Sequence, residues 1–214
     1  MGRGDTRGRI AQTAVGLFNE RGTAAVSTNH IAEAAGISPG NLYYHFRNKE
    51  EIIRAILERM IASWNEVPAL PQDRAPTLTD LRTILGETFS VLWEYRFFYR
   101  EFVALMRRDH QLGRRYRGVR ERGLANTEVL IKSFVEGGVL RGSEDPTAVP
   151  NLATILWLIT EFWLPFAEMG EEAVGPERSQ EGVDLMTQIL KPYTTEEALA
   201  ELGSDRQAVY MRGE

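Results

Sequence analysis

The chain has 214 residues, of which 43% are hydrophobic and 26% charged, so its composition is that of a globular protein of one or two domains. It contains no cysteine, which excludes disulfides, thiolate chemistry and cysteine-ligated zinc. The net charge of −5 argues against a protein that coats nucleic acid with its whole surface. However, residues 1–59 carry eight Lys/Arg against six Asp/Glu and the remainder 17 against 24, so any nucleic-acid contact is expected at the N-terminal end.

The first predicted helix runs from the basic N-terminus to Gly22, a residue type that commonly ends helices. Its apolar residues recur at spacings of three and four, namely Ile10, Ala14, Leu17 and Phe18. Three arginines precede or open this helix, namely Arg3, Arg7 and Arg9. They are compatible with a frayed, solvated terminus and equally with an arm that contacts phosphates or a minor groove. The N-terminal residues lack the apolar core of a secretion signal, so we expect a cytoplasmic protein.

Residues 27–51 predict two short helices, a tight turn between them and the start of a third helix. The first helix begins at an N-cap, Ser27 or Thr28, and ends at Gly36, because glycine readily adopts the left-handed conformation. The second begins with Ser38 as its N-cap. The three boundaries therefore follow from local chemistry.

The second helix is too short to carry much core of its own. Leu42 and Phe46 stand four positions apart and form its apolar face, which leaves the other side chains to be presented outwards. Two helices joined in this way are typical of a helix-turn-helix, whose second helix enters the major groove of DNA. Asn48 then caps a long helix to about residue 64, with Glu51 in the position of a capping-box acid.

Residues 27–50 read S-T-N-H-I-A-E-A-A-G-I-S-P-G-N-L-Y-Y-H-F-R-N-K-E, which closely resembles the DNA-binding signature of the TetR/AcrR family of transcriptional regulators. The resemblance implies an all-α chain with an N-terminal three-helix helix-turn-helix domain and a C-terminal helical domain for ligand binding and dimerisation. It also implies a set of DNA-binding residues, namely Thr28, Asn29, Ser38, Pro39, Gly40, Asn41, Tyr43, Tyr44, His45 and Lys49. Lys49 matches the family's phosphate-clamping lysine, and Asn41 is the expected base reader because its amide suits the edge of adenine.

Three prolines between residues 68 and 76 break the helical pattern and indicate a domain boundary. We expect a DNA-binding domain with its connecting helix, a ligand-binding and dimerisation domain and a frayed tail, at residues 1–66, 77–203 and 204–214 respectively. Thr77, followed by Asp80, predicts a capping box at the start of an amphipathic helix. One further helix should extend to about residue 108.

Seven arginines lie between residues 107 and 122, namely Arg107, Arg108, Arg114, Arg115, Arg117, Arg120 and Arg122. They form either a solvated helix face or a second DNA contact. We favour the solvated face, because no glycine-capped short helix accompanies them and charge runs are common on surfaces.

Residues 152–166 read L-A-T-I-L-W-L-I-T-E-F-W-L-P-F and are apolar on nearly every side. The stretch is too short and too polar for a membrane span, so we expect no membrane partner. A helix that is apolar all round belongs in a core or an oligomer interface, and residues 180–190 supply a second apolar helix. We therefore predict a homodimer through these two helices, with the interface candidates Leu156, Ile159, Trp163, Val183, Met186 and Leu190.

Catalysis is not expected. Two of the three histidines fall inside the helix-turn-helix, and neither a phosphate-binding loop, G-x-S-x-G nor H-E-x-x-H occurs, so the sequence indicates no enzyme, metal or cofactor. Glu161 lies in an apolar stretch, where an unpaired carboxylate is costly. It should either meet an arginine, which we favour, or line a polar spot in a cavity.

The C-terminal part is rich in aromatic residues, which form either a plain core or a small-molecule pocket of the kind that the family resemblance implies. The pocket candidates are Trp93, Phe97, Phe98, Phe102, Met106, Trp157 and Glu161. The combined prediction is a homodimeric, DNA-binding transcriptional repressor, released from an inverted-repeat operator by a small hydrophobic ligand. The alternative is a helical interaction protein without specific operator binding or ligand control.

Overall fold

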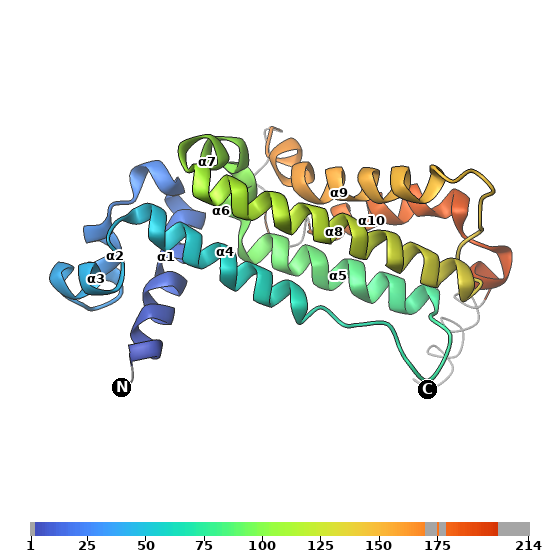
Figure 1. Ribbon diagram of the computed structural model, residues 1–214, viewed down its shortest axis with the longest axis horizontal. Helices are drawn as coiled ribbons and strands as arrows, with labels where there is room; N and C mark the ends of the chain where they lie inside the picture. The colour runs from blue at the N-terminus through green and yellow to red at the C-terminus, as the bar shows by residue number, and fades with distance from the viewer. Residues whose placement is uncertain (1–2, 170–174, 176–178, 201–214) are drawn as a thin grey trace. The chain divides into compact units, whose positions relative to one another are not determined.

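The computed structural model describes residues 3–169, 175 and 179–200 (Figure 1). Within these ranges the chain is helical and forms no β-strand beyond a single bridge between Leu140 and Thr194, which confirms the all-α prediction. The helices, in chain order, are α1 (Arg3–Ala25), α2 (Thr28–Ala34), α3 (Pro39–His45), α4 (Lys49–Asn65), α5 (Leu78–Glu94), α6 (Arg96–Arg100), α7 (Phe102–Arg108), α8 (His110–Glu136), α9 (Ala148–Ala167), α10 (Ser179–Leu190) and the 3-10 turn η2 (Lys191–Tyr193). A last helix starts at residue 196 and is described to residue 200; the expected frayed tail, 204–214, lies outside the described residues.

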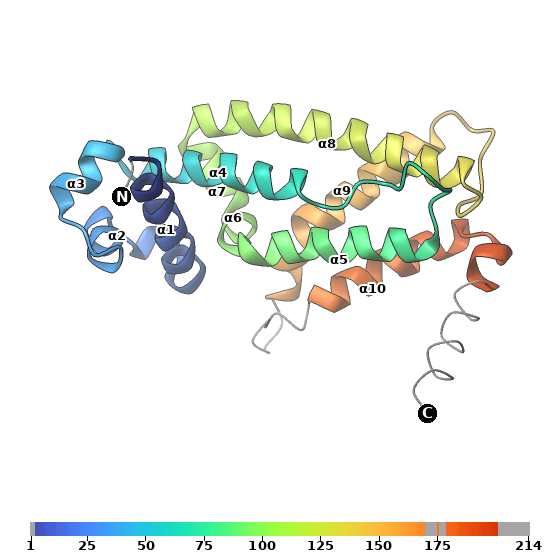
Figure 2. The ribbon, with the colours of Figure 1, turned by 90° about the horizontal axis from the view of Figure 1, so that it is seen from below.

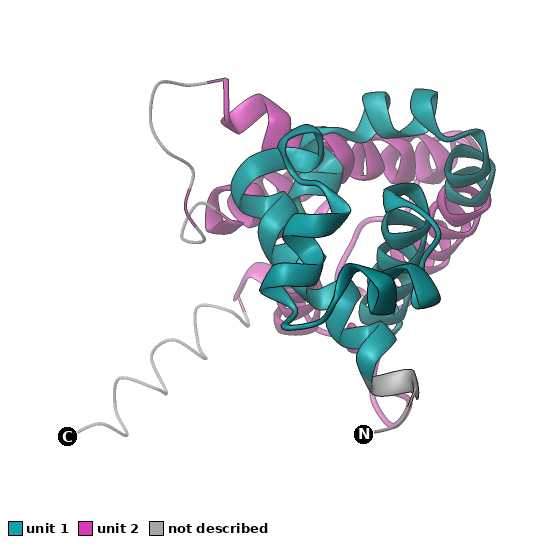
Figure 3. Cartoon of the chain, turned by 90° about the vertical axis from the view of Figure 1, so that its left-hand side faces the viewer, with its two compact units in different colours: residues 1–66, 91–117 teal, residues 67–90, 118–214 magenta. Residues whose placement is uncertain are grey.

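The chain divides into two compact units (Figure 3). Unit 1 comprises residues 1–66 and 91–117, and unit 2 comprises residues 67–90 and 118–214. This division differs from the expected one, because residues 91–117 group with the helix-turn-helix rather than with the C-terminal helices. Unit 1 therefore carries 15 Lys/Arg against 10 Asp/Glu, and unit 2 carries 10 against 20. The separation of charge is sharper than the sequence order suggested.

Unit 1 is built on α1, which packs against α2, α4 and α6. The ring of Phe18 on α1 meets that of Phe97 on α6, with centroids 5.1 Å apart. The side chain of Asn19 satisfies two backbone groups beside them. Its Nδ2 donates to the carbonyl of Glu94 at 2.8 Å, and its Oδ1 accepts from the N–H of Phe97 at 3.0 Å. One buried amide thus joins α1 to the end of α5 and the start of α6.

Residues 96–108 form two short helices, α6 and α7, where the sequence predicted one. The break lies at Glu101, whose backbone has φ −104° and ψ 11°. Its carboxylate accepts the backbone N–H of Thr23 at 2.6 Å and also the Thr23 hydroxyl. Thr23 follows Gly22, where a positive φ of 73° ends the regular part of α1 as predicted. A long-range contact with the end of α1 therefore coincides with the break.

Unit 2 contains α9 and α10 side by side (Figures 1 and 2). Its helices approach closely at glycines: a Cβ placed on Gly182 of α10 would lie 2.0 Å from the ring of Phe89, and one on Gly123 would lie 2.1 Å from the ring of Trp157. Phe89 also meets Trp163 edge-on, at 5.4 Å between centroids. Small residues in these places allow aromatic rings to fill the core.

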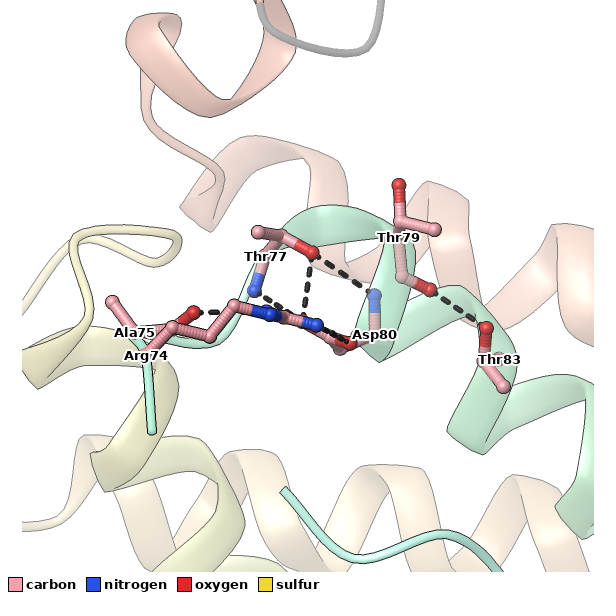
Figure 4. A network of polar contacts seen from close by, with 6 residues as sticks. All are labelled: Arg74, Ala75, Thr77, Thr79, Asp80 and Thr83. Carbon is pink, nitrogen blue, oxygen red and sulfur yellow. Dashed lines mark hydrogen bonds and ion pairs between the residues drawn. The ribbon is translucent and has the colours of Figure 1, made fainter. Parts of the chain in front are cut away.

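The predicted capping box at the start of α5 is confirmed (Figure 4). The carboxylate of Asp80 accepts the N–H of Thr77 at 2.8 Å, and the Thr77 hydroxyl accepts the N–H of Asp80 at 3.3 Å. Arg74 adds a bidentate ion pair to Asp80 at 2.6 and 2.8 Å. These hydrogen bonds from Arg74, assisted by Thr77, hold the pKa of Asp80 well below its usual range.

Helix α9 has 20 residues, which is longer than the apolar stretch expected from the sequence. By length and composition alone it could cross a membrane, a test that core helices of soluble proteins also pass. Proline lies inside it at Pro165, and Glu161 is buried within the unit. The length and apolar composition of α9 are thus only weak evidence for a membrane span.

Candidate nucleic-acid interface

The first helix of the helix-turn-helix has the predicted ends. Ser27 is the N-cap of α2: its hydroxyl accepts the N–H of His30 at 3.2 Å, and Nδ1 of His30 accepts the N–H of Ser27 at 3.3 Å. Gly36 follows the helix with φ 65°, and the N–H of Ile37 returns to the carbonyl of Ala32 at 3.0 Å. The histidine in the capping box was not predicted, because Glu or Gln usually takes that place.

The second helix, α3, presents most of its surface to solvent. Its N-cap Ser38 accepts the N–H of Asn41 at 3.2 Å, and the whole helix has seven residues. Leu42 is 0% exposed and Phe46, its C-cap, 1%, which confirms them as anchors. The remaining residues form the outer surface of α3, where DNA contacts were predicted: Pro39, Gly40, Asn41, Tyr43 and Tyr44 are exposed and His45 is half-buried.

Tyr43 links the two helices across this surface. Its hydroxyl lies 2.9 Å from the hydroxyl of Thr28, the first residue of α2. The neighbouring ring of Tyr44 meets that of His45 edge-on, with centroids 5.2 Å apart. Two predicted DNA contacts from different helices, Thr28 and Tyr43, therefore lie together, and the hydrogen bond restrains the tyrosine.

Lys49 is engaged in a way that the sequence did not indicate. Its ammonium donates to the carbonyl of Thr23 at 2.5 Å and to that of Val26 at 2.9 Å, which joins the start of α4 to the segment between α1 and α2. Two of its three N–H groups are thus used inside unit 1.

The cap of α4 differs from the prediction in one detail. Asn48 accepts the N–H of Glu51 at 2.9 Å, as expected for an N-cap. However, the carboxylate of Glu51 accepts the N–H of Arg47, at 2.8 Å, rather than that of Asn48 itself. The Glu51 side chain therefore satisfies the backbone N–H of the residue before the N-cap, which lies in the loop after α3.

Arg7 contacts the C-terminal end of α3. Its Nη1 donates to the carbonyl of His45, and its guanidinium lies over the ring of Phe46, 4.0 Å from the centroid. Because α1 is helical from Arg3 onwards, a frayed terminus does not describe this part of the chain. No sequence spacing relates Arg7 to α3, so this contact was not predicted.

The arginine-rich segment falls partly in unit 1, where two of its residues form ion pairs with α4. Arg115 makes a bidentate pair with Glu58, at 2.6 and 2.7 Å. Asp109 pairs with Arg54 at 2.5 Å. Burial opposes the ionisation of Asp109, but hydrogen bonds from the backbone and from Arg54 lower its pKa on balance. The other six arginines of the cluster are all exposed, which agrees with a solvated surface.

The predicted ligand-pocket residues are divided between the units. Phe97, Phe98 and Phe102 belong to unit 1; the Phe98 ring lies 6.3 Å from that of Phe97 and 6.0 Å from that of Phe102, between centroids. Together with Tyr116, 5.6 Å from Phe98, they form an aromatic cluster, as a plain core requires.

The other four candidates are not part of that cluster. Trp93 is half-buried under the guanidinium of Arg96, at 4.8 Å from the ring centroid, and Met106 is half-buried. Trp157 and Glu161 lie on α9 in unit 2, where Glu161 is only 5% exposed. The structure therefore does not gather the seven predicted residues within one unit.

The predicted dimer contacts point into unit 2. Leu156, Trp163, Val183, Met186 and Leu190 are buried within the chain, and Ile159 is half-buried. A different set is exposed, by 42–77%, and we call it the apolar stripe: Ile155, Leu158, Phe162, Phe166, Met169 and Leu185. Five of the six predicted interface residues are therefore core residues of the chain, because a helix that is apolar all round does not reveal which side faces its own core.

Two family profiles match the chain. The one described as "Bacterial transcriptional repressor" covers residues 48–202, and the one described as "Bacterial regulatory proteins, tetR family" covers residues 10–56. The chain belongs to the TetR family. Its members are DNA-binding transcriptional regulators and not enzymes, so the exposed α3 lies in the DNA-binding domain of a regulator.

Solved and curated TetR-family proteins resemble the chain to different extents. A TetR-family transcriptional regulator from Marinobacter aquaeolei VT8 is 31% identical, with a TM-score of 0.82 over 94% of this chain and 97% of that one. The repressor KstR2 of Rhodococcus jostii (strain RHA1) is 38% identical over 86 residues, or 38% of this chain and 42% of KstR2. The repressor NicS of Pseudomonas putida is 28% identical over 141 residues, which are 64% of this chain and 65% of NicS. The chain thus matches less than two thirds of the length of these curated relatives.

Proposed function

We propose that this TetR-family protein is a homodimeric repressor that binds an inverted-repeat operator through α3 and is released by a small apolar ligand. The observation that carries the DNA-binding part is the surface of α3. Leu42 and the C-cap Phe46 anchor α3, while most of the other residues of this seven-residue helix are exposed. The helix belongs to a unit with 15 Lys/Arg against 10 Asp/Glu, which favours a polyanionic partner.

The exposed residues of α3 suggest separate roles on DNA. Asn41 has an exposed amide, which can hydrogen-bond to adenine at two positions in the major groove. Tyr43, restrained by Thr28, and Tyr44 offer hydroxyl groups to phosphates or base edges. The third N–H of Lys49 is available for a phosphate. In this proposal Asn41 contributes selectivity and Lys49 contributes affinity for any sequence.

The apolar stripe supports the homodimer. Its members on α9 recur at spacings of three and four, so they lie along one side of that helix, and Leu185 adds α10. Contiguous exposed apolar surface commonly marks a protein interface. A two-fold dimer requires an inverted-repeat operator, with half-sites about 34–36 Å apart or a multiple of that spacing.

Ligand release is supported by cavities within unit 2. One has a volume of about 460 Å³, and half of its ten lining residues are leucines; Arg82 and Lys191 also line it. Another, of about 410 Å³, lies between α8 and α9 and includes Ile131, Leu152 and Tyr193. Both volumes are within the range of small-molecule sites. A solved protein of the same fold, SmeT, is described in complex with triclosan; it is 24% identical, with a TM-score of 0.62.

The test of operator binding is a mobility-shift titration with DNA fragments from the protein's own locus, at several salt concentrations. We expect one fragment to bind at least about 10³-fold more tightly than random DNA. Footprinting that fragment should show two inverted half-sites. Equal affinity for all fragments would instead favour the helical interaction protein without a specific operator.

Ligand control is tested separately by a thermal-shift screen of lipophilic compounds, followed by operator release. A ligand at about 100 times its Kd stabilises the protein by about 2.7 kcal/mol, which such a screen detects. Compounds that stabilise the protein should also weaken operator binding, because linkage between two sites is reciprocal. Stabilising compounds that leave DNA affinity unchanged would refute the inducer role.

A further inference from the structure

Arg7 holds the C-terminal end of α3, although 38 positions separate it from His45. Its Nη1 donates to the carbonyl of His45, the last residue of the helix, and the central carbon of its guanidinium lies over the ring of Phe46, 4.0 Å from the centroid. One side chain of α1 therefore contacts both the end of α3 and the residue that caps it.

A helix of this length needs such support. Seven residues are too few for a stable helix in water, so the geometry of α3 depends on its surroundings. Its N-terminal end is capped by Ser38, and Leu42 and Phe46 anchor its inner side. The last carbonyls of a helix lack partners within it, and a cation there is favourable. Arg7 supplies that cation and also covers Phe46.

We infer that Arg7 is a positioning residue for DNA reading, and that its guanidinium is not a phosphate contact. This inference rests on the proposed function, because it concerns the same surface of α3. Donation from Nη1 to His45 and the contact with Phe46 hold the guanidinium of the exposed Arg7 against the end of α3. Donation from its other N–H groups to a phosphate is the competing role. By holding the end of α3, Arg7 sets the direction in which Asn41, Tyr43 and Tyr44 face the major groove.

The salt dependence of binding separates these roles. Loss of a phosphate contact reduces the slope of log K against log salt by about 0.9, whereas loss of a positioning contact leaves the slope unchanged. We expect Arg7→Ala to weaken specific operator binding about 10-fold, as the loss of a cation–π contact and a charged hydrogen bond allows, with random-DNA affinity unchanged. Arg7→Lys should recover only part of the affinity, because an ammonium lacks the planar stacking face.

Hydrogen exchange of α3 gives a readout without DNA. The N–H of Phe46 donates to the carbonyl of Leu42 at 2.9 Å, so its exchange rate reports the opening of the last turn. We expect about 10-fold faster exchange in Arg7→Ala. Arg21→Ala, which removes an exposed charge from the same helix, should leave the rate unchanged.

Two further variants complete the experiment. Lys49→Ala is the comparison for a proposed phosphate contact. Arg54→Ala breaks the ion pair with Asp109 in the same unit and measures the effect of general destabilisation. If Arg54→Ala lowers both the melting temperature and the specific affinity as much as Arg7→Ala does, the effect is one of stability and the inference is overturned.

The other outcomes are equally decisive. A slope lower by about 0.9 in Arg7→Ala, with full recovery in Arg7→Lys, would assign Arg7 to a phosphate. Unchanged affinity and unchanged exchange would make it a solvated surface residue. If the wild-type protein bound all DNA equally, the proposed operator would fail, and faster exchange at Phe46 in Arg7→Ala would still support the role of Arg7 in ordering α3.

Discussion

Phe162→Glu is expected to dissociate the proposed homodimer. Phe162 lies within the apolar stripe, whose six members are 42–77% exposed. Burying an apolar side chain completely contributes about 1.5–3 kcal/mol, so covering about half of one contributes about 1 kcal/mol. Six such side chains on each of two protomers then contribute about 10 kcal/mol of binding free energy. This is comparable to the 4–15 kcal/mol that association costs in lost freedom of motion. The dimer has little excess stability to lose.

The substitution acts twice in a symmetric dimer. Each copy loses about 1 kcal/mol of apolar contact and places a carboxylate in an apolar surface, at a cost of at least about 1 kcal/mol even if it is partly hydrated. The total of about 4 kcal/mol corresponds to dimerisation that is about 10³-fold weaker. Binding to an inverted repeat should fall accordingly, whereas binding to a single half-site should be unchanged.

Sedimentation velocity from nanomolar to micromolar concentration measures the effect directly. Val129→Glu is the matched control, because Val129 is also an exposed apolar residue, at 63%, but lies on α8 outside the stripe. Thermal unfolding should show that both variants remain folded. A wild-type monomer at micromolar concentration, an intact dimer in Phe162→Glu, or equal dissociation in Val129→Glu would refute the reasoning.

Three further substitutions test other parts of the chain. Asn41→Ala should cost about 1–3 kcal/mol against the preferred base at one position per half-site, as binding to operator variants would show; equal loss on random DNA would rule it out as a base reader. Lys49→Ala should weaken binding to every sequence and lower the salt slope by about one unit, and it should also lower the melting temperature because two carbonyls lose their donor. An unchanged slope would leave Lys49 a purely structural role. The lowered pKa of Asp80 stabilises the fold above the unfolded pKa of about 3.9, and this contribution is lost as pH falls further. The urea midpoints of wild type and Asp80→Asn should therefore converge below about pH 4; a constant difference would show that ionisation of Asp80 does not matter.

The helix boundaries of the helix-turn-helix could be predicted from neighbouring residues. Ser38 accepts from the N–H three positions on, and Gly36 ends α2 with a positive φ. Thr77 and Asp80 likewise cap α5 through groups three residues apart. Such interactions depend only on residue types within one turn of helix, so the pattern of the sequence contains them completely. The two anchors of α3, Leu42 and Phe46, could also be predicted, because they stand four positions apart on one side of a helix.

The partners of Arg7 and Lys49 could not be predicted in this way. They lie 38 positions away for Arg7 and 26 and 23 positions away for Lys49, and no periodicity relates residues so far apart. Residues 91–117 group with the helix-turn-helix and make unit 1 basic. This grouping also depends on contacts between residues far apart in the sequence, so it could not be predicted. A spacing of three and four residues shows that a helix has an apolar side, but not which surface covers it. On α9, apolar on all sides, folding alone decides that Leu156 is buried and Phe162 is left exposed.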